Sequence, residues 1–139
     1  MNIRPYEPED QTAVLDLWER CGLIDSDSRA VAITDLNRKL QVQPDLFLVG
    51  VLGEEVIATA MAGYDGHRGH LYYLAVCPQH QRQGYGRQIV SQVDKLLHER
   101  GCHRLTLFVS NDNLVVTGFY ERLGFEHNEV ISMGRFTGK

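Results

Sequence analysis

The feature that most constrains this chain is a glycine-bearing loop between an apolar strand and an amphipathic helix. Residues 71–77 are apolar or aromatic and precede Pro78, which predicts a strand that ends there. After the loop, apolar side chains recur at helical spacing up to Gly101; they are Ile89, Val90, Val93, Leu96 and Leu97. The loop at residues 81–86 therefore opens onto a helix N-terminus, where unpaired backbone N–H groups and the helix dipole favour a bound anion.

The remaining sequence alternates weaker helical patterns with short apolar runs. We expect an extended start at residues 3–6, helices over residues 8–21 and 33–40, and a strand pair at residues 46–52 and 56–62. A strand at residues 105–109, a helix over residues 116–123 and final strands within residues 125–136 complete the order. This order predicts an α/β (α+β) fold, with a mixed, mostly antiparallel sheet flanked by about four helices. The length of 139 residues suits a single domain spanning residues 1–139.

Charge and composition argue against several classes of partner. The net charge of −4 and the pI near 5.8 disfavour a nucleic-acid-binding protein, which needs a basic face. No apolar run approaches the roughly 20 residues that span a bilayer, and the start lacks the apolar core of a signal peptide. We therefore expect a cytoplasmic protein without a membrane partner. The cysteines, Cys21, Cys77 and Cys102, lie far apart and outside any CxxC pair, so neither a disulfide framework nor a metal site is expected.

The loop at residues 81–86 differs from two common phosphate-binding loops. A Walker loop requires Lys and then Ser or Thr after its second glycine, and this pair does not follow Gly86. The dinucleotide fingerprint requires a third Gly or Ala where Ile89 stands. Arg82 and Arg87 could still add charge-assisted hydrogen bonds to a phosphate. Because two glycines alone more often only shape a strand-to-helix turn, the assignment depends on other parts of the chain.

Two spaced patterns together are more specific. The first is Q/R-x-x-G-x-G, formed by Gln81, Gly84 and Gly86 behind an apolar strand. The second is N-x6-Y-x3-G-F, which begins at Asn113 and includes Tyr120. With them the chain resembles the GNAT superfamily of N-acetyltransferases, whose element order it matches from about residue 3 to about residue 133. Residues 63–76 also resemble a bacterial subgroup typified by YpeA, which indicates a bacterial protein but names no substrate.

The resemblance implies acetyl-CoA as the cosubstrate, without a metal ion, and a set of contacts for it. The loop amides would hold the pyrophosphate, and the residues concerned are Gln81, Arg82, Gln83, Gly84, Tyr85, Gly86 and Arg87. Leu74, Ala75 and Val76 would pair through their backbone with the two amides of pantetheine. Asn113 would add a hydrogen bond to the same arm. Tyr120 would contact the coenzyme and, as the catalytic acid, donate to the departing thiolate.

The acceptor implied by the resemblance is a primary amine of a small molecule or of a protein, and its proton must be removed before attack. The candidates for this base, besides water, lie on or before the strand at residues 71–77; they are Asp65, His67, His70, Tyr72 and Tyr73. A covalent acetyl intermediate on Cys77 is a less favoured alternative to direct transfer, because no histidine stands at a diagnostic spacing. A non-catalytic regulatory module that binds acyl-CoA is the alternative from another function class. The resemblance also implies a possible homodimer through residues 125–136.

Overall fold

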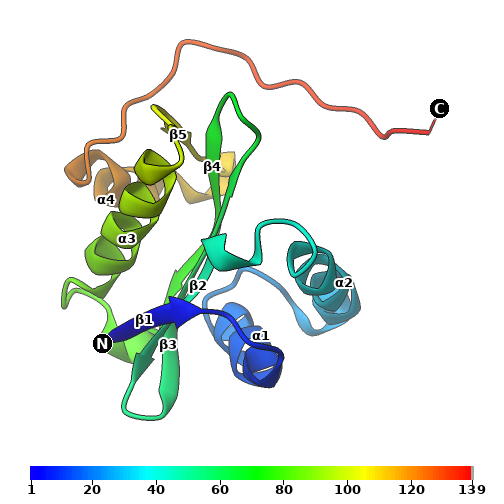
Figure 1. Cartoon of the computed structure of the whole chain (residues 1–139), viewed down its shortest axis with the longest axis vertical. Helices are drawn as coiled ribbons and strands as arrows, with labels where there is room; N and C mark the ends of the chain where they lie inside the picture. The colour runs from blue at the N-terminus through cyan, green and yellow to red at the C-terminus, as the bar shows by residue number, and fades with distance from the viewer. Residues whose placement is uncertain (139) are drawn as a thin grey trace. The chain divides into compact units, whose positions relative to one another are not determined.

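The computed structural model describes residues 1–138, which form two compact units, residues 1–108 and residues 109–138. The first unit contains one five-stranded sheet with the strand order β1-β2-β3-β4-β5 (Figure 1). The strands are β1 (Asn2–Pro5), β2 (Phe47–Leu52), β3 (Glu55–Tyr64), β4 (Gly69–Val76) and β5 (Leu105–Thr106). All neighbouring pairs are antiparallel except β4 and β5, which run parallel. The predicted mixed, mostly antiparallel sheet is therefore confirmed.

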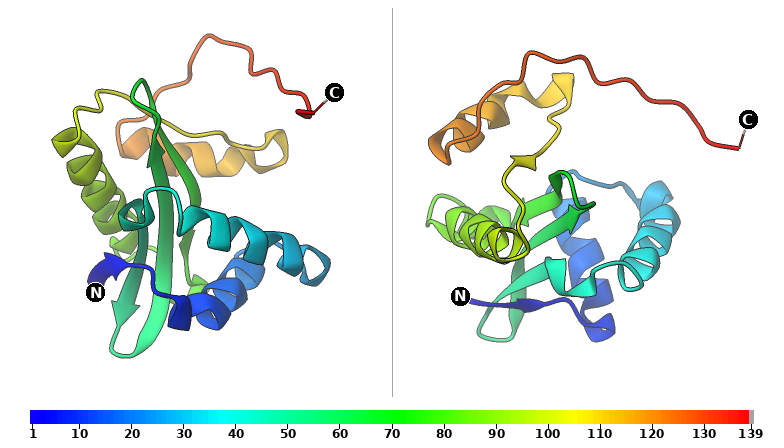
Figure 2. Two further views of the ribbon diagram at one scale, coloured as in Figure 1. Left: turned by 45° about the vertical axis from the view of Figure 1, so that its right-hand side comes forward. Right: turned by 45° about the horizontal axis from the view of Figure 1, so that its top comes forward.

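Three helices cover the two faces of this sheet. α1 (Gln11–Arg20) and α2 (Arg29–Lys39) lie on one face, and α3 (Tyr85–Glu99) lies on the other (Figure 2). Most of the predicted apolar stripe of α3 is buried, namely Ile89, Val90, Val93 and Leu97. α1 buries Val14, Leu15, Leu17 and Trp18. A fourth helix, α4 (Thr117–Arg122), belongs to the second unit, so residues 1–138 contain the expected number of α-helices.

An ion pair joins β1 to the start of α1. The chain enters α1 through a short 3-10 turn, Pro8–Asp10, so the α-helix begins later than the sequence predicts. Arg4 donates two hydrogen bonds to the Asp10 carboxylate, at 2.8 Å and 2.9 Å, and the Glu7 N–H donates another at 2.9 Å. The hydrogen bond from Arg4 is the main reason why the pKa of the Asp10 carboxyl lies below its usual value.

Regular structure after residue 104 is shorter than the sequence patterns predict. β5 spans only Leu105–Thr106, and a 3-10 helix, Asn111–Val116, precedes α4. The prediction of strands within residues 125–136 is wrong, because the structure has no strand in residues 125–138. The apolar side chains of that segment beyond Phe125 are at least 76% exposed; they are Val130, Ile131, Met133 and Phe136. Such a pattern forms a strand only where a partner completes the backbone hydrogen bonds, and residues 109–138 supply no partner strand.

Candidate active site

A β-bulge interrupts β4 where it pairs with β3. Thr59 pairs with Ala75, whereas Met61, two residues further along β3, pairs with Tyr72, three residues back along β4. β4 therefore holds one extra residue, and Tyr73 adopts a left-handed backbone conformation with a φ of 50°. Bulges bend a strand and redirect its side chains, and they are common beside active sites.

Two buried side chains hold this bulge in place. The Thr59 side chain is fully buried, and its hydroxyl accepts a hydrogen bond from Trp18 Nε1 at 2.9 Å. The same hydroxyl donates to the Tyr73 carbonyl at 2.8 Å. The Trp18 ring also stacks on the Tyr73 ring, with centroids 3.9 Å apart and planes inclined by 10°. The left-handed residue is therefore fixed by α1 on one side and by β3 on the other.

The outer edge of β4 is open over most of its length. β5 pairs only with Gly69 and His70, so residues 71–76 have no strand on the side away from β3 within the first unit. Leu74, Ala75 and Val76, the residues expected to bind pantetheine, all lie in this open stretch. A strand edge of this kind can hydrogen-bond an amide-containing ligand as it would another strand.

The loop at residues 81–86 follows a 3-10 turn, Pro78–His80, and leads into α3. Gln81 Nε2 donates to the Val76 carbonyl at 3.0 Å, which ties the loop to the end of β4. Arg82 and Gly84 both have positive φ, at 63° and 87°. A backbone that alternates in this way can turn its N–H groups into a concave anion-binding surface. The other predicted contacts, Tyr85, Gly86 and Arg87, form the first turn of α3, and Gly86 is buried.

The N-terminus of α3 has no side-chain cap. Gly84 is the N-cap residue, and the Gln88 N–H donates to its carbonyl at 3.0 Å. Within residues 1–138, the N–H groups of Arg82, Gln83 and Gly84 have no hydrogen-bond acceptor. A Cβ added at Gly84 would meet no atom within 4 Å, so the space above the loop is open. These free donors at the positive end of a helix can hold a phosphate group.

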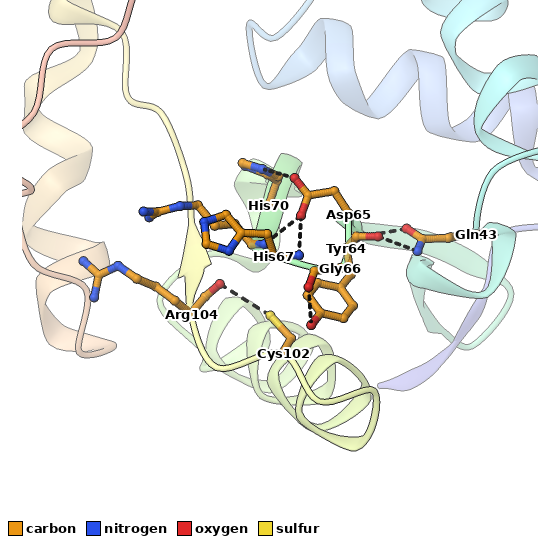
Figure 3. A network of polar contacts seen from close by, with 9 residues as sticks. Gln43, Tyr64, Asp65, Gly66, His67, His70, Cys102 and Arg104 are labelled. Carbon is orange, nitrogen blue, oxygen red and sulfur yellow. Dashed lines mark hydrogen bonds and ion pairs between the residues drawn. The ribbon is translucent and has the colours of Figure 1, made fainter.

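The five candidate bases lie in the turn between β3 and β4 and along β4. Asp65 shapes this turn, because its Oδ1 accepts hydrogen bonds from the N–H groups of His67 and Arg68, both at 2.7 Å (Figure 3). These hydrogen bonds hold the pKa of the Asp65 carboxyl below its usual range, and the one from the Arg68 N–H has the largest effect. Asp65 is therefore a weak base, and His67 is an exposed turn residue.

His70 differs from the other candidates because one of its ring nitrogens has no partner. Its Nε2 lies 4.0 Å from Asp65 Oδ2 (Figure 3), and its Nδ1 is buried without a hydrogen bond within residues 1–138. Thr106, which pairs with His70 across β4 and β5, has a buried and unpartnered Oγ1 as well. Because buried polar atoms are normally hydrogen-bonded, these two atoms mark a place for a polar group such as a water molecule.

Tyr72 and Tyr73 line an open cleft of about 590 Å³, together with charged residues of α2. The Tyr73 hydroxyl donates to Asp35 Oδ2 at 3.5 Å, and burial raises the pKa of the Tyr73 phenol. The phenol therefore keeps its proton at neutral pH and cannot accept one from the amine. The charged residues, Asp35, Arg38 and Lys39, are absent from the sequence-based candidates. Their i, i+3, i+4 spacing, which places them on one face of α2, is the signal that could have found them.

Asn113 and Tyr120 lie in the second unit. Asn113 is exposed, and its φ of −128° and ψ of 40° interrupt the 3-10 helix. Tyr120 is half-buried, and its ring contacts Phe119 and Phe125 edge-on, with centroids 5.3 Å and 5.7 Å away. Burial raises the pKa of the Tyr120 phenol. The hydroxyl therefore keeps its proton at neutral pH and can serve as a hydrogen-bond donor.

Cys77 is placed poorly for a covalent role. Its side chain is 1% exposed, and its Sγ donates to Gln79 Oε1 at 2.8 Å. Arg20 Nη1 donates to the same sulfur at 3.5 Å. No histidine within residues 1–138 is hydrogen-bonded to the sulfur, so the described structure offers it no general base.

Residues 1–138 contain no group of three or more His, Cys, Asp or Glu side chains that could hold a metal ion. No helix in the same range is both long enough and apolar enough to cross a membrane.

Known families and structures match both the sequence patterns and the fold. The family model described as the acetyltransferase (GNAT) family matches residues 8–125, which is most of the chain. The chain belongs to this GNAT family. The resemblance inferred from the two motifs is thereby confirmed at the level of the superfamily, and the YpeA-like subgroup stays a prediction.

Three proteins with known names are among the solved structures that are similar to this GNAT protein. An aminoglycoside antibiotic 6′-N-acetyltransferase from Acinetobacter haemolyticus has a TM-score of 0.82 at 21% identity, over 100% of both chains. The PaiA N-acetyltransferase from Thermoplasma acidophilum, in complex with coenzyme A, has a TM-score of 0.78 at 17% identity, over 94% of this chain and 92% of that one. Ard1 from Thermoplasma volcanium has a TM-score of 0.76 at 25% identity, over 90% and 82%. These likenesses confirm the GNAT fold.

Proposed function

We propose that this chain transfers an acetyl group directly from acetyl-CoA to a primary amine of a small molecule or a protein. The observation that carries the proposal is the junction of the open β4 edge with the loop at residues 81–86, made by the Gln81–Val76 hydrogen bond. Coenzyme A combines two amides in its pantetheine arm with a pyrophosphate. An open strand edge suits the amides, and the N–H groups at a helix N-terminus suit the pyrophosphate.

The proposed coenzyme contacts follow from this junction. Leu74, Ala75 and Val76 pair with pantetheine, and the pyrophosphate rests on the N–H groups of the loop and the first turn of α3. The residues of this cradle are Gln81, Arg82, Gln83, Gly84, Tyr85, Gly86 and Arg87. Asn113 adds a hydrogen bond to the pantetheine arm. The bulge at Tyr73 supports the assignment, because it redirects β4 just before the three pantetheine residues.

The proposed reaction needs one proton acceptor and one proton donor. The amine nitrogen attacks the thioester carbonyl, so a C–N bond forms while the C–S bond breaks. The proton lost by the amine goes to His70, directly or through a water at its unpartnered Nδ1. Tyr120 donates a hydrogen bond to the departing thiolate, in keeping with the raised pKa of its phenol.

The experiment that tests the coenzyme site compares two glycines with similar backbones. Gly84 and Gly53 both have positive φ, and a Cβ at either would meet no atom within 4 Å. Gly84→Leu and Gly53→Leu should therefore carry a similar strain, about 1 kcal/mol each. Only Gly84→Leu places a side chain where we expect phosphate. Isothermal titration calorimetry should show that this variant loses acetyl-CoA binding, while Gly53→Leu binds like the wild type.

Acetyl transfer is measured separately, as thiol released from acetyl-CoA in the presence of amines, peptides and polyamines. Acceptor-dependent thiol release supports the transferase. Coenzyme binding without such release would instead favour the non-catalytic regulatory module. If Gly84→Leu binds acetyl-CoA with unchanged affinity, the assignment of the loop to the pyrophosphate is wrong.

A further inference from the structure

The open cleft beside α2 lies entirely within the first unit and has a mixed lining. Its volume of about 590 Å³ falls in the usual range of small-molecule sites, roughly 300 to 1,000 Å³. Its apolar and aromatic residues are Leu23, Val42, Met61, Tyr72 and Tyr73. Its charged residues are Asp35, Arg38 and Lys39. A site of this composition can bind an apolar group together with charged groups of both signs.

The three charged side chains are not neutralised by the protein. None of them forms an ion pair within residues 1–138. Asp35 accepts only the hydrogen bond from the Tyr73 hydroxyl, and Lys39 Nζ donates to the Ala62 carbonyl. Lys39 is half-buried, and burial is the main reason why its pKa is lowered. A partly desolvated ammonium without an anionic partner is unfavourable, and a bound anion would relieve this cost.

The local charge of the cleft is opposite in sign to that of the chain. The chain carries a net charge of −4, whereas the cleft holds two cations and one anion. A polycation such as an aminoglycoside or a polyamine would meet repulsion from Arg38 and Lys39. A ligand with one ammonium and one carboxylate would find a partner of opposite sign for each.

On the basis of the proposed function, we propose that the cleft binds an acceptor amine that also carries a carboxylate, such as an amino acid with an apolar side chain. Arg38 and Lys39 hold the carboxylate, and Asp35 with the Tyr73 hydroxyl receives the ammonium. The apolar side chain contacts Leu23, Val42 and Met61. Tyr73 belongs both to the cleft and to the β4 bulge, so the amine lies beside the strand edge proposed to hold the thioester arm.

The test compares L-phenylalanine with L-phenylalaninamide, which keeps the amine but lacks the carboxylate. Affinities are measured by saturation-transfer NMR in the presence of coenzyme A, at a slightly acidic pH at which both amines are protonated. We expect the acid to bind about tenfold to a hundredfold more tightly than the amide. Arg38→Gln should reduce this ratio severalfold, because Lys39 alone then holds the carboxylate, with the affinity for coenzyme A unchanged. Lys95→Gln, which removes a positive charge from an exposed site on α3, should keep the ratio.

Equal affinities for acid and amide, no binding of either, or tighter binding of spermidine would overturn the inference. An acid-to-amide ratio that Arg38→Gln leaves unchanged would do the same, and urea unfolding verifies that this variant is folded. The proposed function fails in a distinguishable way. If the acid binds with the expected preference but no amine releases thiol from acetyl-CoA, the cleft assignment stands and the transferase proposal falls.

Discussion

Replacing Thr59 with valine tests whether a single hydroxyl holds the β4 bulge. Valine has nearly the same shape, so the change removes the hydroxyl without opening a cavity in the core. Two hydrogen bonds disappear together, the one from Trp18 Nε1 at 2.9 Å and the one to the Tyr73 carbonyl at 2.8 Å. The Trp18 donor is left in a fully buried site, whereas the Tyr73 carbonyl is only partly buried.

The size of the effect follows from these two orphaned groups. A buried polar group that loses its partner costs about 1–3 kcal/mol, and the Tyr73 carbonyl can recover part of this from water. We therefore expect Thr59→Val to lower the free energy of unfolding by about 2–4 kcal/mol, which leaves most domains of this size folded. Tyr73 also has a strained, left-handed backbone worth about 1–2 kcal/mol. If the bulge relaxes when its support is lost, the KM for acetyl-CoA should rise roughly five- to thirtyfold.

Urea unfolding followed by tryptophan fluorescence measures the first effect, and initial rates at varied acetyl-CoA concentration measure the second. Thr34→Val is the matched control, because Thr34 lies on the exposed face of α2 and its hydroxyl bonds only to the Ala30 carbonyl. The control should change stability by less than about 0.5 kcal/mol. A loss below about 0.5 kcal/mol in Thr59→Val, with an unchanged KM, would refute the role assigned to this hydroxyl.

The remaining predictions concern turnover and acid stability. Tyr120→Phe should lower kcat about ten- to a thousandfold while the affinity for acetyl-CoA stays nearly constant, because only the donor to the thiolate is lost. His70→Asn should lower kcat by about a hundredfold or more, and an unchanged kcat in either variant removes that residue from the reaction. Tyr64→Phe, which removes a hydroxyl bonded to the Gly66 and Gly101 carbonyls, is the control and should retain kcat. Asp10→Asn should destabilise the protein by about 1–3 kcal/mol at pH 7, since the Arg4 guanidinium loses its anionic partner. Because the pKa of Asp10 is lowered in the folded state, its contribution is present above the ordinary value of 3.8 and is lost as pH falls through the lowered value. Between about pH 5 and pH 2, urea unfolding should therefore lose less stability in Asp10→Asn than in the wild type, and equal losses would contradict the role of this pair.

Local patterns predicted the elements whose structure depends on neighbouring residues. The stripe of Ile89, Val90, Val93 and Leu97 predicted α3, because helical hydrogen bonds and helical periodicity both act within a few residues. The apolar run at residues 71–77 predicted β4 to within two residues. The spacing of glycines in residues 81–86 placed a loop at the helix N-terminus, and α3 begins at Tyr85.

The sequence-based predictions are wrong where a strand or a site needs a partner that is distant in the sequence. Residues 125–136 include several apolar side chains, yet residues 109–138 provide no strand to complete their hydrogen bonds. β5 ends after Thr106, and β4 pairs with it at only two positions. The sequence pattern also does not indicate that the charged face of α2 lines a cleft. Asp35, Arg38 and Lys39 look like a solvated helix surface in the sequence, and only the packing of α2 over the sheet places them in the cleft.

The sequence by itself determined the family, the order of the helices and strands up to α4, and the position of the loop at residues 81–86, since each depends on residues a short distance apart along the chain. The tertiary structure alone decided the geometry of β4. The bulge at Tyr73 depends on Thr59, which is 14 residues away, and Thr59 in turn binds Trp18 across 41 residues. Contacts between residues so far apart leave no periodic signal, because they arise only when helix and sheet have packed together. The cleft beside α2 likewise exists only in the packed structure, so its excess of positive charge could not be inferred from the net charge of −4 of the chain.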